Sequence, residues 1–510
     1  MNDSGFKLAA RVADSSLSIG LVSSPGKTLT SSGCAAKVPA NGYFFDCWIV
    51  LLRVDAGRQG CLVESLLAAD IALLPASLAA IDVLLDDLGV YAPICALWVA
   101  QDAKHGTAAL TDGRPTTAMV TFVRLMVLKA RTGWGYEALV REVADSLHLR
   151  RFCLIGLSGR VPDESTLRKL CRRLGADTVD ALTREVISRS AAQTQFRARA
   201  ARIDSTVVEA DIKFPTDAGL AADGVLLLAR VGRGLVGLAG SGAPRVRDRG
   251  RGAKGRMRRL GRTLKRRNGE AKTEVLKITR ECGDLLALSA REARKLERFL
   301  AAGSDPQRAA VPALAEQIVR CERVCEQIDM RLAGERITDR LVSLQDPDAR
   351  PICKGKLAKR TEFGYVQQIC EVTENTRGAR GYILAPSTAP GNPGENELLP
   401  ATLAQLDALG ISITELALDG GFRVTATTDA LTASAQTPDT VAIAGTQEPD
   451  SPRTRRRLYC YRSGAEGRIS HLKRGYGLRR SRLKGHDGQR TWCGWAILAY
   501  NLDTHTHRLH

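Results

Sequence analysis

Two acidic residues stand where a carboxylate could do chemistry. Asp204 lies inside the β-branched stretch Ile203-Asp-Ser-Thr-Val-Val208, and Asp419 follows Leu416-Ala-Leu and precedes two glycines. A buried acid is costly unless it is paired or binds a metal, and an acid at a strand end beside a glycine turn lies where ligands approach an α/β sheet. Taken alone, each acid is more typical of a structural carboxylate that forms an ion pair or caps a turn.

A third acid, Glu466, belongs to a patterned segment. Tyr459, Arg462, Glu466 and Lys473 have sequence offsets of 0, 3, 7 and 14. At about 100° per residue, all four fall on one helical face within roughly 60°. Such a face suits a carboxylate that holds a divalent ion while the cations and the hydroxyl bind phosphates nearby. The alternative is a solvated helix face stabilised by salt bridges.

Three carboxylates from distant segments are typical of a two-metal site. Two Mg²⁺ ions about 4 Å apart would bridge a scissile phosphate, one activating a water or a 3′-hydroxyl and the other stabilising the leaving oxygen. Oxygen ligands favour Mg²⁺, or Mn²⁺, over zinc. Basic side chains around the site would neutralise a DNA backbone.

These residues resemble a known family. Tyr459, Arg462, Glu466 and Lys473 fit the Y-x2-R-x3-E-x6-K signature of insertion-sequence transposases of the DDE class, and the context is most similar to the ISNCY-like group. The resemblance extends from about residue 74 to 502. The motifs that carry it are GRPTTAMVTFVRLMVLKARTGWGYEALVREVADSLHLRRF (113–152), RIDSTVVEADIKFPTDAGLAADG (202–224), DPDARPICKGKLAKRTEFGY (346–365) and EGRISHLKRGYGLRRSRLKGHDGQRTWCGWAILAYNL (466–502).

The resemblance implies an RNase H-like catalytic fold, Mg²⁺ and a DDE triad, which by position would be Asp204, Asp419 and Glu466. The chain also departs from the family. The family usually has Asp-Arg-Gly-Tyr where this chain has Asp419-Gly-Gly-Phe422, and a proline-and-basic stretch after the next strand is replaced by Ala442-Ile-Ala-Gly-Thr-Gln-Glu448. Both changes leave the acids in place but alter side chains that could contact DNA.

Hydrophobic periodicity predicts the elements that position these residues. We expect an α/β protein, an RNase H-like mixed β-sheet flanked by helices, with an N-terminal all-α domain and a basic helical insertion. Strand patterns are found at 201–210, 363–370, 381–384, 416–419 and 440–443, and helical patterns at about 455–474 and 492–502, whereas 224–229 could be either. The predicted domains are a poorly defined extension (1–73), an all-α DNA-binding domain (74–198), the catalytic domain (199–235 and 341–510) and the insertion (236–340).

Two basic regions are candidates for DNA contact. Between Arg245 and Arg267, twelve of twenty-three residues are Arg or Lys. Like charges repel one another without an anion, so this block is either a DNA-binding arm, which we favour, or a solvated loop. A second cluster follows the Glu466 segment and is predicted to contact phosphates; it includes Arg474, Arg479 and Arg480.

Composition limits the classes of function. The 510 residues contain 74 Lys and Arg against 55 Asp and Glu, a net charge of +19. Such an excess indicates a polyanionic partner, most often nucleic acid, although anionic membranes also attract basic proteins. No apolar run reaches the roughly 18 residues of a membrane helix, and neither a secretory signal nor a paired-cysteine framework is recognisable among thirteen cysteines. We therefore expect a bacterial cytosolic or nucleoid protein.

The sequence thus predicts a transposase that cuts and joins DNA at terminal inverted repeats. Asp204, Asp419 and Glu466 would bind Mg²⁺, while Tyr459, Arg462 and Lys473 would position the DNA backbone. We expect double-stranded DNA as the partner, no membrane, and a homodimer or higher oligomer on DNA. Two alternatives remain open: a catalytically inactive or domesticated DNA-binding derivative, and a metal-dependent nuclease that cuts without joining strands.

Overall fold

The structure is a computed structural model, and it describes residues 6–13, 16–23, 68, 73–105, 117–266, 269–353, 361–377, 380–447 and 449–509. Near the N-terminus, β1 (Phe6–Ala13) and β2 (Ser16–Ser23) form an antiparallel hairpin. The sequence pattern did not predict this hairpin. The rest of the predicted N-terminal extension, apart from residues 68 and 73, lies outside the described residues.

An all-α region follows, as the helical periodicity predicted. Its longest helical segment is α8 (Glu164–Thr194), which is kinked at the non-helical Gly175. The side chain of Asp163 caps its first turn by accepting a hydrogen bond from the backbone N–H of Thr166. Apolar side chains of these helices form one continuous core. The other helices of the region are α3 (Ala76–Asp86), η2 (Leu88–Tyr91), α4 (Ala92–His105), α5 (Met119–Thr132), α6 (Tyr136–Asp145) and α7 (Leu147–Phe152).

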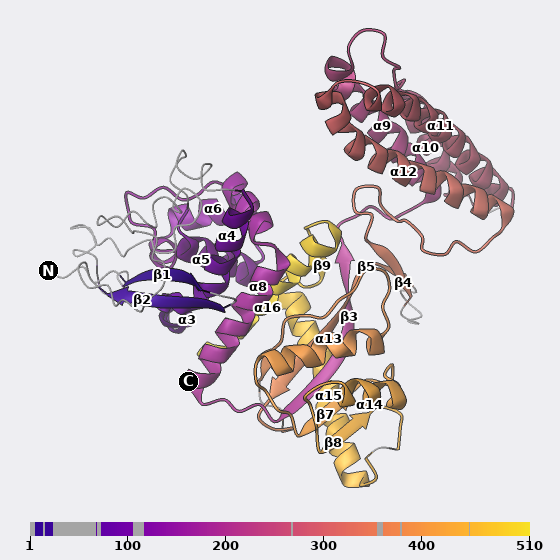
Figure 1. Cartoon of the computed structure of the whole chain (residues 1–510). Coiled ribbons are helices and arrows are strands. Elements are labelled where there is room, and N and C mark those ends of the chain that lie inside the picture. Colours follow the sequence, from indigo (N-terminus) through magenta and orange to yellow (C-terminus); the bar gives the residue numbers. More distant parts are fainter. Residues whose placement is uncertain are drawn as a thin grey trace.

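A seven-stranded mixed sheet occupies the middle of the molecule (Figure 1). Its main path runs β4-β5-β3-β7-β8, with β3 antiparallel to β5 and parallel to β7, and β7 parallel to β8. Two short strands pair outside this path, β6 with β5 and β9 with β3. The strands are β3 (Ala200–Ala210), β4 (Arg350–Cys353), β5 (Thr361–Thr373), β6 (Tyr382–Ile383), β7 (Glu415–Leu418), β8 (Thr440–Ile443) and β9 (Arg480–Ser481). The sequence patterns had indicated β3, β5, β6, β7 and β8.

Helices cover both faces of the sheet. On one face, α13 (Glu395–Ala408) buries Leu399 and Leu403 in a core shared with Ile203 of β3, and α14 (Val424–Thr432) lies beside α13. On the other face, Leu472 of α15 (Pro452–Gly475) shares a core with Val208 of β3. The alternating side chains of β3 therefore enter two separate apolar layers.

The last helix joins two regions that the sequence had separated. α16 (Gly485–Leu509) buries Trp495, Leu498 and Leu502 in the core of the all-α region, against α8 and α5. The predicted catalytic segment 341–510 thus contributes its final helix to the core of segment 74–198. The all-α region and the sheet are connected by packing as well as by the chain.

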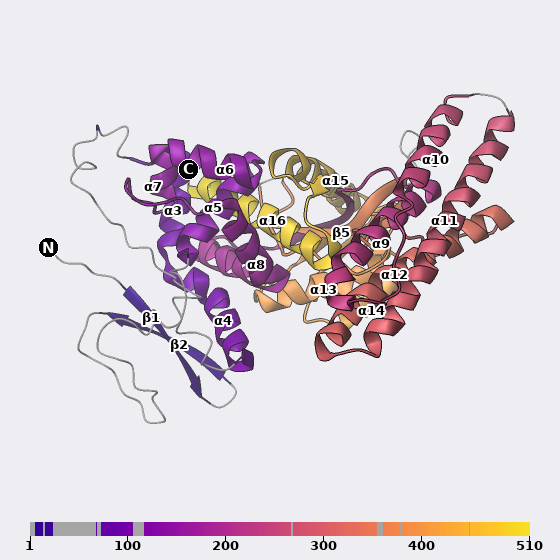
Figure 2. The same ribbon diagram turned by 90° about the horizontal axis from the view of Figure 1, so that it is seen from above.

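A four-helix bundle interrupts the sheet between β3 and β4. It consists of α9 (Asp217–Ala239), α10 (Gly250–Thr263), α11 (Gly269–Ala301) and α12 (Asp305–Ala333), which share one apolar core. The ambiguous stretch 224–229 is helical, and the predicted boundary between residues 235 and 236 falls inside α9. Figure 1, and Figure 2 from above, place the bundle on the opposite side of the sheet from the all-α region.

Among the described residues, no helix is both long enough and apolar enough to cross a membrane. The ten cysteines that the structure describes are all free thiols.

Candidate active site

The register of two parallel strands brings Asp204 and Asp419 together. Ile203 of β3 pairs with Leu418, the last residue of β7, and an aspartate follows each of them in the chain. Asp204 is only 8% exposed, whereas the side chain of Asp419, one residue beyond the end of β7, is 38% exposed. The predicted convergence of these two acids is therefore present, with one carboxylate rooted in the sheet and the other at its edge.

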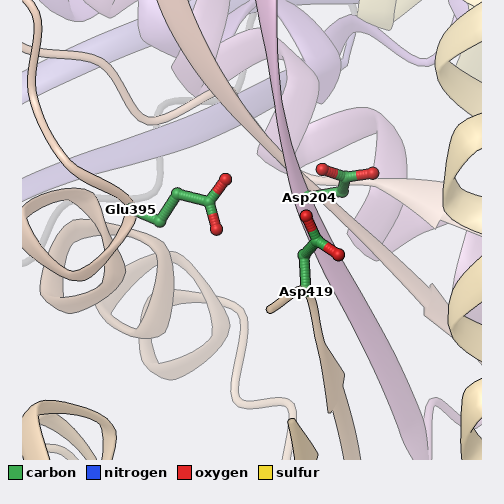
Figure 3. Close-up of side chains that lie close together, drawn as sticks. All are labelled: Asp204, Glu395 and Asp419. Carbon is green, nitrogen blue, oxygen red and sulfur yellow. The ribbon is translucent and has the colours of Figure 1, made fainter. Parts of the chain in front are cut away.

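A third carboxylate arrives from a helix that the sequence analysis did not consider. Glu395 is the first residue of α13, and its carboxylate forms a group with those of Asp204 and Asp419. One oxygen from each residue lies within 4.8 Å of the other two, and the three side chains approach from β3, the end of β7 and the start of α13 (Figure 3). The available signal was an acid at the first helical turn after Pro393-Gly394, where the N-terminal helix charge favours carboxylates.

The loop after Asp419 holds Glu395 in place. A β-carbon at Gly421 would lie 2.6 Å from an Oε of Glu395, so the carboxylate packs directly against the glycine backbone. Beside it, the Asn396 side chain donates to the carbonyl of Gly421 and accepts from the backbone N–H of Arg423, at 3.4 and 3.1 Å. A larger residue at position 421 would displace the Glu395 carboxylate from its present position.

The donor set fits a hard cation. Three carboxylates this close repel one another when ionised, and a divalent cation with oxygen ligands removes that repulsion. No histidine or cysteine belongs to the group, which favours Mg²⁺ or Mn²⁺ over zinc or copper. It is the one candidate group of three or more metal-binding side chains among the described residues.

Glu466 lies near this group but outside it. Arg462 of α15 donates to an Oδ of Asp419 at 2.7 Å and to an Oε of Glu466 at 3.5 Å. The guanidinium thus stands between the two carboxylates, and the side chain of Glu466 is 68% exposed. The structure brings Asp204 and Asp419 together and connects Glu466 to them through Arg462.

The other predicted DNA-binding residues have varied surroundings. The hydroxyl of Tyr459 contacts the carbonyls of Ile443, at 3.0 Å, and Thr446, at 2.7 Å, so this side chain anchors α15 to the end of β8. Arg474 and Arg479 are exposed. Arg480 pairs with Glu209 at 3.0 Å and lies 3.8 Å from Asp211, and Lys473 is half-buried on α15.

A buried ion network fixes α15 on the sheet. Arg202, two residues before Asp204 on the same face of β3, binds Glu371 of β5 through two nitrogens at 2.9 and 2.6 Å, and Arg468 of α15 binds the other carboxylate oxygen at 2.9 Å. Arg202 also donates to the carbonyl of Tyr461 at 2.9 Å. Burial raises the pKa of Tyr461, whose hydroxyl lies 2.6 Å from that of Thr373.

The helix can approach this network because it carries a glycine there. A β-carbon at Gly464 would lie 1.9 Å from a guanidinium nitrogen of Arg202. The glycine that weakens a helix prediction from sequence is thus the residue that lets α15 cross β3 closely. Asp204 and the Glu466 turn of α15 are positioned by the same contact.

Two protein-family models match the chain. A family described as "Transposase domain (DUF772)" matches residues 77–173, within the all-α region. A family described as "Transposase DDE domain" matches residues 345–502, which include Glu395, Asp419 and the whole of α15. No curated protein and no solved structure gives a significant match to the chain.

Proposed function

Because the chain belongs to the DDE-class transposases of insertion sequences, we propose that it catalyses transposition by hydrolysing and rejoining phosphodiester bonds at terminal inverted repeats. The observation that carries this proposal is the parallel register that sets Asp204 beside Asp419. The mixed sheet with an acid at the middle of its central strand is consistent with an RNase H-like catalytic domain.

Asp204 and Asp419 would hold Mg²⁺, together with Glu466 as the resemblance implies or Glu395 as the geometry favours. When bound, the metal supplies an activated water or 3′-hydroxyl and stabilises the leaving oxygen. Both hydrolysis and strand transfer are in-line attacks on a phosphodiester, so one set of carboxylates can serve both steps. The planar guanidinium of Arg462 is suited to phosphate oxygens. When DNA binds, it would release the carboxylate of Asp419 or Glu466 and bind a phosphate of the scissile strand instead.

DNA would reach the site along the basic side chains that follow Glu466. Lys473, Arg474, Arg479 and Arg480 are proposed to contact its phosphates, because charge complementarity dominates binding to DNA. The all-α region would contribute to recognition of the element's ends, and we expect a homodimer or higher oligomer on DNA in the bacterial cytosol.

The test uses the purified protein, Mg²⁺ and a labelled duplex that carries the element's ends. Asp204→Asn and Asp419→Asn should each lower cleavage by roughly 10³-fold or more, since a lost ligand removes several kcal/mol of transition-state stabilisation. DNA binding, measured by gel shift, should survive in both variants. Wild-type cleavage by both variants would exclude this site.

The same assay identifies the third ligand. Glu395→Gln and Glu466→Gln are compared with a control, Glu397→Gln. Glu397 is an exposed acid on α13 about half a helical turn from Glu395, and its replacement should leave cleavage unchanged. A large loss in Glu466→Gln alone supports the triad implied by the resemblance, and a large loss in Glu395→Gln alone supports the geometric cluster.

An alternative function has one observation in its favour. Gly420 and Phe422 stand where the family usually has Arg and Tyr, which favours a derivative that has lost catalysis but still binds DNA. Such a protein would bind the ends without cutting them at any Mg²⁺ concentration. A nuclease without strand transfer would instead yield cut ends that are never joined to target DNA.

A further inference from the structure

Helix α10 has two faces that differ in how their charges are used. The helix belongs to the segment where the sequence predicted either a DNA-binding arm or a solvated loop. The structure makes it a helix that packs against α9 and α11 (Figure 2). Ala253, Leu260 and Thr263 are buried in the bundle and define its inner face.

Arginines on the bundle side are neutralised by acids of α11. Arg249 binds Glu292 at 2.6 Å, Arg256 binds Glu281 at 3.1 Å, and Arg259 binds Glu281 at 2.6 Å and Glu274 at 3.1 Å. Hydrogen bonds from Arg259 and Arg249 lower the pKa of Glu281 and Glu292, respectively. These arginines hold α10 onto α11 and have their charge satisfied within the protein.

The outer face carries cations without such partners. Arg251, Lys254, Arg258 and Arg262 are all exposed, and we call them the α10 stripe. Their offsets of 0, 3, 7 and 11 place them within about 80° of one another around the helix. Among the described residues, no ion pair is formed by any of the four. Lys265 and Arg266 are exposed directly after the helix.

The length of the α10 stripe favours a polyanion over a small anion as its ligand. Eleven residues of helix span about 16 Å, whereas one strand of DNA carries a charge about every 3.4 Å along the axis. A single phosphate or a nucleotide would reach one or two of these cations, but a polyanion can contact all four. A membrane surface is a poorer ligand, because helices that lie on membranes expose an apolar face and the apolar face of α10 is buried in the bundle.

Two glycines, Gly255 and Gly261, leave the backbone on this side of the helix without covering side chains. A β-carbon added at Gly255 or Gly261 would meet no atom within 4 Å, so packing inside the bundle does not require glycine at either position. Glycine weakens a helix relative to alanine. Bare backbone between long cations is suited to the close approach of another molecule.

We propose that the α10 stripe binds the sugar–phosphate backbone of double-stranded DNA, as a second contact surface separate from the carboxylate site. The proposal rests on the proposed function only for the identity of the polyanion. Contacts of this kind carry no sequence information; they add affinity and fix the orientation of the bundle on the duplex.

The test measures binding, not cleavage, in an Asp204→Asn background, so a failure of the catalytic proposal does not affect it. The stripe variant changes all four cations to Gln, which keeps helix propensity. A matched control changes four exposed cations of α11 to Gln; these are Lys272, Lys277, Arg280 and Arg291. Circular dichroism verifies that both variants fold, and fluorescence anisotropy with a mixed-sequence duplex gives the affinity at several salt concentrations.

We expect the stripe variant to bind duplex about 10- to 100-fold more weakly near 0.1 M salt. The slope of log affinity against log salt concentration should be smaller in magnitude by up to about 3.6, or 0.9 for each of the four lost phosphate contacts. The control should change the affinity by less than about threefold, as expected for charges outside the contact surface. Equal losses in the two variants would show a diffuse electrostatic effect and overturn the proposal. It is also overturned if the stripe variant binds duplex normally, or if it loses affinity only for anionic vesicles or single-stranded RNA.

Discussion

Helices α15 and α10 are both rich in arginine, but they differ in where the arginines that form ion pairs lie. On α15, Arg457 pairs with Glu415, Arg462 with Asp419, and Arg468 with the buried Glu371. On α10, comparable pairs occupy the bundle side only, and the outer cations face solvent. The number of arginines on a helix therefore does not by itself identify a DNA-binding surface; the ion pairs that each cation forms within the protein must be considered as well.

This difference assigns distinct tasks to the two helices. Arg457 and Arg468 fix α15 against β7 and β5, and Arg462 connects Glu466 to Asp419. The cations of the α10 stripe form no ion pair among the described residues and are exposed to an external anion. Changes on α15 should therefore affect stability and catalysis, and changes on the α10 stripe should affect DNA affinity.

The largest effect is expected at the buried network beneath α15. Glu371→Gln would leave Arg202, whose side chain is 6% exposed, without its charge partner, at a cost of about 3–5 kcal/mol. The control is Glu415→Gln, which breaks the more exposed pair with Arg457 and should cost about 1 kcal/mol or less. Chemical denaturation followed by circular dichroism measures both. Equal shifts would mean that the buried network does not hold α15.

A pair of glycines on α15 gives the next effect. Gly464→Ala would place a β-carbon 1.9 Å from a guanidinium nitrogen of Arg202, so either that guanidinium leaves its partners or the helix moves away from β3, at a cost of about 1–3 kcal/mol. Gly467→Ala meets no atom within 4 Å and should stabilise the helix by up to about 1 kcal/mol. Opposite shifts in denaturation midpoint are expected. If both variants shift in the same direction, the close crossing of α15 over β3 is not a constraint on this helix.

Arg462 offers a test in which affinity and activity separate. The guanidinium lies 2.7 Å from a carboxylate oxygen of Asp419, and its positive charge would repel a metal ion bound there. Arg462→Gln should therefore tighten Mn²⁺ binding several-fold, as measured by electron paramagnetic resonance of free Mn²⁺. Cleavage should fall by roughly 10- to 100-fold, because a charge-assisted contact to phosphate is worth about 1.5–3 kcal/mol. Lys272→Gln on α11, an exposed cation outside both proposed DNA-contact surfaces, is the control and should change neither quantity by more than about twofold. Unchanged Mn²⁺ affinity in Arg462→Gln would contradict this role.

Local sequence patterns predicted the strands that carry Asp204 and precede Asp419. The β-branched pattern around Asp204 predicted β3, and the apolar runs at 416–419 and 440–443 predicted β7 and β8. The parallel pairing that sets the two acids side by side was not predicted and comes from the structure. The assignment of Asp204, Asp419 and Glu466 as catalytic ligands stays a prediction.

Other features depend on contacts between segments that are distant in the chain. The role of Glu395 depends on where the start of α13 docks, which is set by the glycine loop after Asp419 and not by any local pattern. Similarly, the sequence pattern of α16 is that of an ordinary amphipathic helix. The residues around Trp495 do not indicate that this helix packs in the core of the all-α region. Helical periodicity gives the apolar face of an element but not the partner of that face.

The smallest expected effect is a pH dependence confined to the bundle side of α10. Bonds from Arg259 and Arg249 lower the pKa of Glu281 and Glu292 below the ordinary value of 4.5. A lowered carboxyl pKa means that the stabilisation is complete above the unfolded pKa and is lost as pH falls through the folded pKa. Both acids are partly exposed to solvent, which screens the pairs, so each pair should contribute about 1 kcal/mol or less. We therefore expect the denaturation midpoint of the bundle to decrease only below about pH 4.5.

The matched variant for this prediction is Glu281→Gln with Glu292→Gln. It removes both titrating groups, so its midpoint should already be lower at neutral pH and should decrease less than that of the wild type on acidification. The α10 stripe contains no acid, and its cations keep their charge throughout this range. DNA affinity should consequently not fall between pH 7 and pH 5 in either protein. A loss of affinity in that range would mean that carboxylates on the bundle side, rather than the stripe, control how α10 meets DNA.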